Sequence, residues 1–186
     1  MKKTKVVFTG YYGFDNFGDD LFGVACCHAL EKVSRDHVPF VLSPPVGGSR
    51  IGYSGRYIVP RILQTAYKSK NSVGKFLRAA YMVYCCLRYS EVVLAGGSVI
   101  SSGSSMRMRA LQMFFAKCGI CRLSAIGVSV GPFSNLDDRE KAKSFIGCLT
   151  FLTVRDVASV VECKSLGVSV QPLLYNDLAG CAPLPS

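Results

Sequence analysis

The stretch Gly10-Tyr11-Tyr12-Gly13-Phe14-Asp15-Asn16-Phe17-Gly18-Asp19-Asp20 decides how the rest of the chain is interpreted. A short apolar run at residues 5–9 precedes it, and an apolar helical pattern at residues 21–33 follows it. Glycines in a strand-to-helix turn permit positive φ angles and let a ligand approach the main chain closely. The N–H groups at the start of a helix favour anionic or oxygen-rich groups. The stretch therefore predicts a ligand-binding turn after a first strand.

Two features limit what this turn is expected to bind. Asp19 and Asp20 would satisfy the helix N–H groups themselves if they acted as caps, so a sugar hydroxyl or a neutral edge suits the turn better than a bare phosphate. The glycine spacing, G-x-x-G-x-x-x-x-G, also differs from the G-x-G-x-x-G fingerprint of dinucleotide-binding proteins. An ordinary tight turn that needs glycine for its backbone conformation is the alternative.

The pattern of apolar runs around this turn predicts the fold class. The chain has 186 residues, of which 49% are hydrophobic, and this suffices for one domain with a full core. Short apolar runs bounded by Gly, Pro or Ser predict strands at residues 5–9, 39–42, 56–59, 91–94, 124–128, 149–154 and about 169–173. Helical patterns lie between them. This alternation indicates an α/β protein with a doubly wound, mostly parallel, Rossmann-like sheet.

Three of the helical segments have specific signals. One continuous apolar stripe with helical spacing comprises Val73, Phe76, Leu77, Ala80, Tyr81, Tyr84 and Leu87. Lys75 and Arg78 lie off that stripe. The run Ser134-Asn135-Leu136-Asp137 has the capping chemistry of a helix start. A third helix is expected over residues 156–166, where a glycine follows as a C-cap.

Basic residues are concentrated where acidic residues are absent. The formal net charge is +10, and no Asp or Glu lies between His37 and Ser90 or between Val92 and Leu136. These spans project a positive field that attracts an anionic substrate, an anionic membrane face or nucleic acid. A solubilising basic surface is the alternative. No recognised nucleic-acid motif accompanies the charge, so a nucleic-acid partner is not expected.

Cysteine and hydropathy patterns indicate the compartment. The nine cysteines are odd in number and lie mostly inside apolar runs, which fits buried thiols in a reducing compartment. Cys118 and Cys121 form the one CxxC motif, and no second pair or histidine set matches it, so no metal site is expected. No apolar run approaches the roughly 18 residues of a membrane span, and the run after the basic N-terminus is too short for a signal peptide. A cytoplasmic protein is expected.

The turns that follow four of the expected strands carry polar or glycine-rich sequences. In parallel sheets, ligands bind beyond the carboxyl ends of the strands. The four turns are residues 10–20, Ala95-Gly96-Gly97-Ser98, Ser129-Val130-Gly131-Pro132 and Arg155-Asp156. Because these turns would share one edge of the sheet, they predict a cleft that binds a polar ligand.

The same motifs, in this order, resemble the polysaccharide pyruvyl transferase family. They read G-x-x-G-x-x-N-x-G-D-D, A-G-G-S, G-V-S-V-G-P, R-D-x-x-S followed by L-G-V, and N-D-L-A at residues 176–179. The resemblance covers about residues 5–180 and implies one lobe of a two-lobed, GT-B-like architecture. We expect residues 1–180 to form this N-terminal lobe and residues 181–186 to be a tail or the start of a second lobe. The family moves the enolpyruvyl group of phosphoenolpyruvate onto sugar hydroxyls as a ketal.

The resemblance also implies the substrate-binding positions of this chain. They are Gly10, Gly13, Asn16 and Gly18 in the first turn, Gly96, Gly97 and Ser98 in the second, Gly127, Ser129 and Gly131 in the third, and Arg155, Asp156 and Ser159 in the fourth. Asp19 matches the first motif as well. Two residues depart from the family pattern, since Asp20 replaces the usual Glu and Ala95 replaces a third glycine.

The chemistry that the resemblance implies assigns candidate roles to charged residues. Ketal formation needs a general acid for the methylene carbon and a base for the sugar hydroxyl. Asp19 and Asp15 are the candidate catalytic bases, with a helix N-cap as the alternative for Asp19. Arg155 is a candidate ligand for the anionic donor, with a structural pair to Asp156 or Asp177 as the alternative. No cofactor is expected, because phosphoenolpyruvate is itself the donor substrate.

Aromatic residues of the first turn give a further hypothesis. Tyr11, Tyr12 and Phe14 are candidates for stacking on a sugar ring, and closing the core is the alternative.

Expected partners follow from the charge and from the resemblance. They are a sugar or lipid-linked oligosaccharide acceptor, an anionic membrane surface that would place the protein peripherally at the inner membrane face, and a second lobe or subunit. Family members continue into a second lobe that is expected to carry much of the phosphoenolpyruvate site. We therefore expect a fragment, a truncated reading frame or half of a split protein. The alternatives are a nucleotide-sugar glycosyltransferase lobe and a non-catalytic binding lobe.

Overall fold

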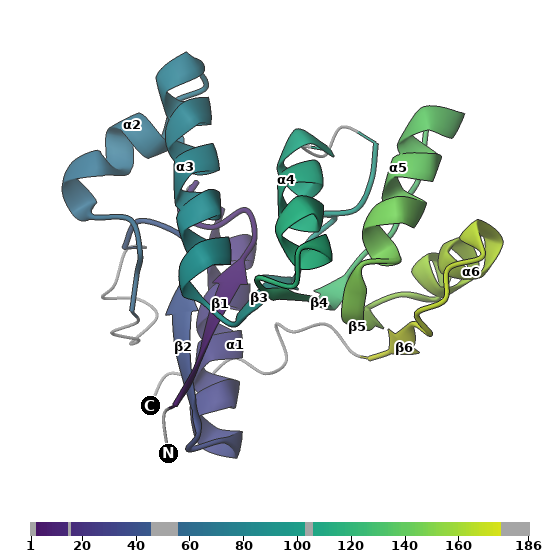
Figure 1. Cartoon of the computed structure of the whole chain (residues 1–186), viewed down its shortest axis with the longest axis horizontal. Coiled ribbons are helices and arrows are strands. Elements are labelled where there is room, and N and C mark those ends of the chain that lie inside the picture. The colour runs from purple at the N-terminus through teal and green to yellow at the C-terminus, as the bar shows by residue number, and fades with distance from the viewer. Residues whose placement is uncertain (1–2, 15, 46–55, 103–105, 176–186) are drawn as a thin grey trace.

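The computed structural model describes residues 3–14, 16–45, 56–102 and 106–175, and within them one parallel sheet organises the chain (Figure 1). The strands are β1 (Thr4–Thr9), β2 (His37–Val41), β3 (Glu91–Ala95), β4 (Arg122–Val128), β5 (Leu149–Val154) and β6 (Leu173–Leu174). The helices are α1 (Phe17–Val33), α2 (Gln64–Lys68), α3 (Ser72–Arg88), α4 (Met106–Lys117), α5 (Leu136–Ile146) and α6 (Val157–Leu166), and a 3₁₀ turn spans Arg61–Leu63. The predicted α/β, Rossmann-like class is confirmed.

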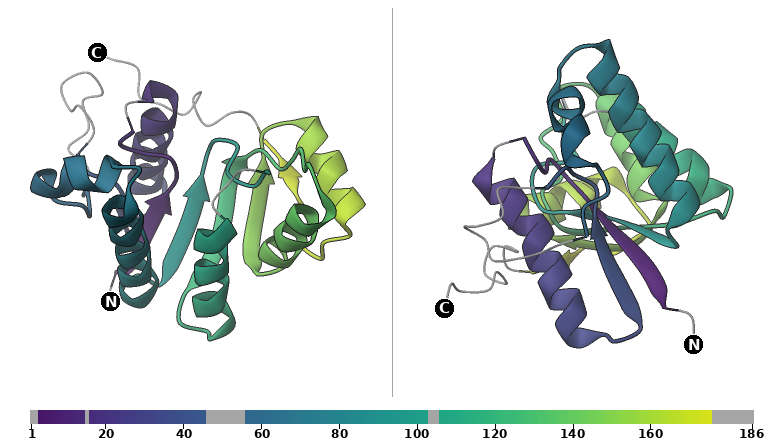
Figure 2. Two further views of the ribbon diagram at one scale, coloured as in Figure 1. Left: turned by 90° about the horizontal axis from the view of Figure 1, so that it is seen from above. Right: turned by 90° about the vertical axis from the view of Figure 1, so that its left-hand side faces the viewer.

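The strand order is β2-β1-β3-β4-β5-β6, and all neighbouring strands pair in parallel. From β1 the chain passes to β2 on one side and later crosses to β3 on the other. Helix α1 packs on one face of the sheet, and α3, α4 and α5 cover the other face (Figure 2). The strand order therefore reverses between β1 and β3, which is where open α/β sheets form a ligand crevice.

Alternate residues of β1 supply the two layers of the core. Val7 packs with the large cluster under α3, α4 and α5, whereas Val6 and Phe8 pack with Phe22 and Cys26 under α1. Side chains of a strand alternate between the faces of its sheet, so one buried strand contributes to both layers. This two-sided burial explains why the strands read as unbroken apolar runs.

Two expected strands are wrong or shortened. Tyr57 of the expected strand 56–59 forms only an isolated parallel bridge with Val41. The chain then leaves the sheet at Pro60, whose ring removes the N–H that a ladder needs, and enters the 3₁₀ turn. The strand expected at about 169–173 is reduced to Leu173–Leu174. The expected domain boundary at residue 180 lies outside the described residues.

Helix α3 turns most of its apolar stripe away from the sheet. The exposed fractions of Val73, Phe76 and Leu87 are 57%, 71% and 62%. On the inner side, the Arg78 guanidinium donates to the carbonyl oxygens of Tyr67 and Ser69, at 2.5 and 2.9 Å. Apolar periodicity alone therefore misassigns the core-facing side of this helix, which is lined by Gly74, Met82, Cys85 and Cys86.

Helix starts agree better with the sequence. The side chain of Asn135 accepts from the Asp138 N–H at 2.8 Å and caps α5, and that of Asp156 accepts from the Ser159 N–H at 2.7 Å and caps α6. Gly167 ends α6 with φ of 64°, in the left-handed region that favours glycine. None of the helices in the described part of the chain has the length and apolar character needed to cross a bilayer.

Candidate functional site

The four polar turns lie at one edge of the sheet, as predicted. Strands β1, β3, β4 and β5 are consecutive neighbours in the sheet and all run in the same direction. The turns that leave their carboxyl ends therefore lie side by side, and the view from above shows them along that edge (Figure 2). The turns after β3 and β4 lie between the first and the fourth turn, and the charge of Arg155 still acts on Asp19, which places both residues at one candidate site.

Asn16, and not Asp19, caps the helix that follows the first turn. The side-chain oxygen of Asn16 accepts from the Gly18 N–H at 3.2 Å, and its amide nitrogen donates to Asp19 Oδ2 at 2.7 Å. Asp20 Oδ1 accepts from the Gly13 N–H at 2.5 Å, which connects the two ends of the turn. The alternative of an N-cap role for Asp19 is therefore wrong, and its carboxylate is held at the edge of the sheet by Asn16. Asp15 lies outside the described residues.

Tyr12 links the first turn to the second through a hydrogen bond. Its hydroxyl donates to the Ala95 carbonyl oxygen at 2.5 Å, and its side chain is only 1% exposed. A Cβ at Gly10 would lie 2.5 Å from the Tyr12 ring, which explains why the turn begins with glycine. Tyr12 thus closes the core and does not offer a face to a sugar. Tyr11 remains half exposed and stacks on Phe14, with ring centroids 4.4 Å apart.

The two glycines of the second turn have different roles. Both have positive φ angles, 71° for Gly96 and 75° for Gly97. A Cβ at Gly96 would lie 2.2 Å from the Phe22 ring, so this glycine lets α1 approach β3. A Cβ at Gly97 would lie 3.1 Å from Asp19 Oδ1, so this glycine keeps the main chain close to the carboxylate. Ser98 follows them as an exposed residue.

The electrostatic environment of Asp19 favours its protonated form. Burial is the main reason that the pKa of Asp19 is raised, and the neighbouring Asp20 carboxylate raises it further. The Arg155 guanidinium opposes both effects and lowers it. A carboxylate with a raised pKa is a stronger base than an ordinary surface aspartate, which suits it to remove a hydroxyl proton.

The third and fourth turns are joined by a hydroxyl between two charges. Arg155 Nε donates to Ser129 Oγ at 2.8 Å, and Ser129 Oγ donates to Asp156 Oδ2 at 2.7 Å. Asp156 Oδ1 also accepts from the Ser159 N–H. Arg155 is thus linked to Asp156 through Ser129. Asp177, the other partner considered for Arg155, lies outside the described residues.

Asp156 is held in its ionised form by this arrangement. Burial raises the pKa of Asp156, but the hydrogen bonds from Ser129 and Ser159 and the charge of Arg155 outweigh it, so the pKa is lowered overall. The Ser159 hydroxyl accepts from the Val130 N–H at 2.8 Å, and Ser159 is 1% exposed. Asp156 and Ser159 therefore order the third turn around Ser129.

Two further glycines shape the third turn. Gly127 has φ of 59°, is buried, and donates its N–H to Thr153 Oγ1 at 2.8 Å. Gly131 has φ of 80°, and a Cβ there would lie 3.2 Å from the Glu162 side chain. Both glycines therefore serve backbone geometry, and Thr153 is a supporting residue that the sequence motifs did not single out.

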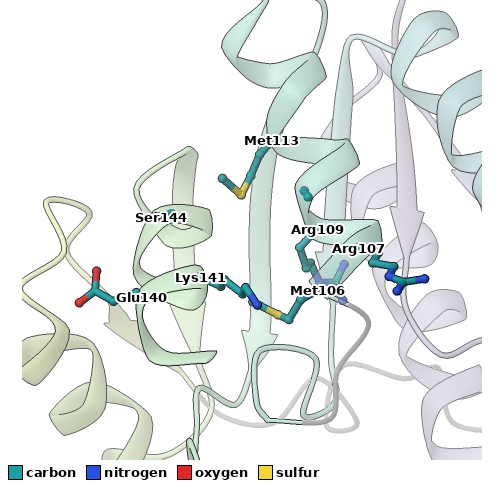
Figure 3. A pocket seen from close by; sticks show the side chains of 8 residues that line it. Met106, Arg107, Arg109, Met113, Glu140, Lys141 and Ser144 are labelled. Atoms are coloured by element: carbon teal, nitrogen blue, oxygen red, sulfur yellow. The ribbon is translucent and has the colours of Figure 1, made fainter. Parts of the chain in front are cut away.

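Arg109 is a second residue that the motifs missed. Its guanidinium donates to the Val99 carbonyl oxygen at 3.2 Å and to Gln112 Oε1 at 2.9 Å, which ties the second turn to α4. Burial lowers the pKa of Arg109 to about 10. Arg109 lines a cavity of about 410 Å³ between α4 and α5, where Met113 and Lys141 also lie (Figure 3). Only its position on α4, after the second turn, could have indicated it.

The described residues contain no group of three or more His, Cys, Asp or Glu side chains arranged to hold a metal ion. The site instead offers one carboxylate with a raised pKa, one guanidinium and several turn hydroxyls and N–H groups. Such groups can orient hydroxyls, remove a proton and bind a phosphate or carboxylate.

Comparison with known proteins identifies the family. A family model described as polysaccharide pyruvyl transferase matches residues 16–183, which is most of the chain. The match begins at Asn16 in the first turn and includes the second, third and fourth turns. No curated protein matches the chain.

Proposed function

Since the chain belongs to the polysaccharide pyruvyl transferase family, we propose that it binds phosphoenolpyruvate and takes part in transferring its enolpyruvyl group onto sugar hydroxyls as a ketal. The family implies a transferase that acts on a polysaccharide acceptor. The observation that carries the proposal within this chain is that Asp19 and Arg155 lie at the same edge of the sheet, where the charge of Arg155 lowers the pKa of Asp19. A basic carboxylate from the first turn and a guanidinium from the fourth turn influence each other electrostatically there, at one edge of the sheet.

Arg155 is assigned to the donor. A guanidinium matches the planar geometry of carboxylate and phosphate groups, both of which phosphoenolpyruvate carries. The hydrogen bond from Arg155 Nε to Ser129 sets the orientation of the guanidinium plane at the edge of the sheet. Asp156, whose pKa is lowered, is ionised and partly offsets the positive charge of Arg155, while the guanidinium can still bind the anionic donor.

Asp19 is assigned to the acceptor. It accepts the proton of one sugar hydroxyl as that oxygen bonds to C2 of the enolpyruvyl group, while C3 takes up a proton from a general acid and becomes a methyl group. A second sugar hydroxyl then bonds to C2, its proton leaves to a base, and inorganic phosphate departs with the electrons of its C–O bond. Asn16, which donates to Asp19 Oδ2, orients the carboxylate for the first step.

We also propose the wider setting of this reaction. The sheet domain would be one lobe of a GT-B-like enzyme, and a second lobe or subunit would complete the phosphoenolpyruvate site opposite the turn edge. The acceptor would be a cell-surface glycan or its lipid-linked precursor at the inner face of the membrane. The positive field of the acid-free spans supports this placement, because it attracts an anionic acceptor and anionic lipid.

Calorimetric titration of the 186-residue chain with phosphoenolpyruvate tests the proposal. Arg155→Ala should weaken binding by about 10-fold to 100-fold, the usual effect of losing a charged hydrogen-bonding group. Arg122→Ala, an exposed arginine at the amino end of β4, should leave it unchanged. Absence of binding by a folded sample would contradict a donor site in this chain, and binding of a nucleotide sugar alone would indicate a glycosyltransferase lobe.

A further inference from the structure

The outer surface of α3 is apolar along the whole helix. Large side chains at i, i+3, i+11 and i+14 are exposed, namely Val73, Phe76, Tyr84 and Leu87. Ala80 lies between them and is also exposed. Phe76 is 71% exposed and Leu87 is 62% exposed, so these side chains lie largely outside the hydrophobic core. A continuous exposed apolar strip of this kind marks an interaction surface.

The neighbouring helix continues this surface. Helices α3 and α4 lie in the same layer on one face of the sheet (Figure 2). The outward residues of α4 are Arg107, Ala110, Phe114 and Lys117, at i, i+3, i+7 and i+10. Phe114 is 60% exposed. We call these four residues and the α3 row together the α3–α4 face.

The charges of this face have one sign. Neither α3 nor α4 contains an acidic residue, whereas α3 carries Lys75, Arg78 and Arg88 and α4 carries Arg107, Arg109 and Lys117. Arg78 and Arg109 donate to carbonyl oxygens within the molecule. The other four cations, Lys75, Arg88, Arg107 and Lys117, belong to exposed residues of the two helices. Apolar side chains bordered by cations are the composition of a surface that lies on anionic lipid.

From this we propose that the α3–α4 face docks on an anionic lipid bilayer. Phe76, Leu87 and Phe114 would enter the boundary between headgroups and acyl chains, and Arg88, Arg107 and Lys117 would contact lipid phosphates. The charge argues against a second copy as the occupant, because two such faces would oppose cation to cation. The docking itself does not depend on the proposed function. Only its biological role does, since docking would bring the turn edge close to a lipid-linked acceptor.

Vesicle co-sedimentation of the full chain tests the docking without any reaction. The vesicles contain phosphatidylcholine with or without phosphatidylglycerol, and they contain no phosphoenolpyruvate or sugar. We expect binding to the anionic vesicles that falls as salt is raised. Phe76→Ser with Leu87→Ser should lower the partition coefficient at least about 10-fold, since two large apolar side chains no longer enter the bilayer. The matched control, Val33→Ser with Val161→Ser, changes exposed residues of α1 and α6 and should bind normally.

Charge is tested by a second pair of variants. Arg107→Gln with Lys117→Gln should lower the partition coefficient at least about fivefold, because each cation near an anionic surface contributes to binding. Lys32→Gln with Lys164→Gln changes the net charge equally at exposed sites on α1 and α6 and should have a smaller effect. Circular dichroism verifies that each variant is folded.

Three outcomes would overturn the docking. They are no binding of the folded wild-type chain, equal loss in test and control variants, and a dimer in sedimentation velocity that the Phe76→Ser and Leu87→Ser changes dissociate. None of them bears on the donor site, because the phosphoenolpyruvate titration is done without lipid. Likewise, failure of that titration leaves the vesicle result intact.

Discussion

Arg155 Nε donates a hydrogen bond of 2.8 Å to the hydroxyl oxygen of Ser129, which joins the turns after β5 and β4. Ser129 Oγ in turn donates a hydrogen bond to Asp156 Oδ2. One neutral hydroxyl therefore separates a cation from an anion and is bonded to both. This arrangement orients the guanidinium and keeps the Asp156 carboxylate ionised.

Replacing Ser129 should affect both charges. In Ser129→Ala, the pKa of Asp156 should rise toward its ordinary value, because a hydrogen bond to the ionised form is lost. Phosphoenolpyruvate affinity should fall by about 2-fold to 10-fold, since Arg155 loses the contact that orients it. NMR titration of the Asp156 carboxyl and calorimetry measure the two effects. Ser169→Ala, at an exposed serine, is the control, and an unchanged Asp156 pKa in Ser129→Ala would contradict the role.

The lowered pKa of Asp156 also predicts a dependence of stability on acid. The folded state prefers the ionised carboxylate, so the contribution of Asp156 to the free energy of unfolding is complete above the ordinary pKa of 3.8. It is lost as the pH falls through the lower folded-state value. Urea unfolding between neutral and acidic pH should therefore show a smaller acid-induced loss in Asp156→Asn than in the wild type. A loss of equal size would show that Asp156 is not a stabilising ionised group.

Asp19 should have the opposite dependence. Because its pKa is raised in the folded state, its carboxylate destabilises the fold once the pH exceeds the ordinary value of 3.8, and the effect is complete above the raised value. Asp19→Asn should therefore increase the free energy of unfolding at pH 7 more than at pH 3, and under the proposed function it should also abolish transfer to the acceptor. Urea unfolding at both pH values and a transfer assay separate the two effects. A variant that is less stable than the wild type at pH 7 would contradict the raised pKa.

The sheet and the edge at which the polar turns gather could be predicted from the sequence because their signals are local. Two-sided burial makes the central strands apolar throughout, and the strand 149–154 was predicted with the bounds that the structure has. Parallel pairing then places the carboxyl ends of neighbouring strands together, which brings Asp19 and Arg155 to one edge without further information.

Features that depend on neighbouring elements could not be predicted. The cap of α1 is Asn16, and Asp20 accepts from the Gly13 N–H, a contact within the turn that helix-capping preferences for aspartate do not contain. Helix α3 turns the partly buried Arg78 inward, where the carbonyl oxygens of Tyr67 and Ser69 accept its hydrogen bonds, and the apolar residues of the opposite side are exposed. In both cases a tertiary contact overrides a local preference.

The glycine of the second turn provides a test of close packing between α1 and β3. Gly96→Ala would place a Cβ 2.2 Å from the Phe22 ring at a positive φ, so it should cost both strain and displacement of a buried aromatic residue. Gly119→Ala has a similar φ of 69° and meets no atom within 4 Å, so it should cost only the backbone strain of about 1–2 kcal/mol. Urea unfolding should show a loss in Gly96→Ala larger by at least about 1 kcal/mol. Equal losses would mean that the Phe22 side chain moves aside for the new Cβ at no measurable cost in stability.

Tyr12 provides the corresponding test of the bond between the first two turns. Tyr12→Phe removes the hydroxyl that donates to the Ala95 carbonyl oxygen at 2.5 Å while keeping the buried ring. Loss of a buried donor should lower the free energy of unfolding by about 1–3 kcal/mol. Tyr11→Phe is the matched control, since Tyr11 is 54% exposed and its change should stay within about 0.5 kcal/mol.

Hydrogen exchange then distinguishes a local role of Tyr12 from a global one. If its hydroxyl holds the turns together, the amides of Gly96 and Gly97 should exchange faster in Tyr12→Phe, by a larger factor than amides in α5. Exchange that accelerates equally in both places would indicate a general loss of stability. Because Asp19 lies against Gly97, selective loosening should also weaken acceptor binding, whereas phosphoenolpyruvate, assigned to Arg155, should bind with nearly unchanged affinity.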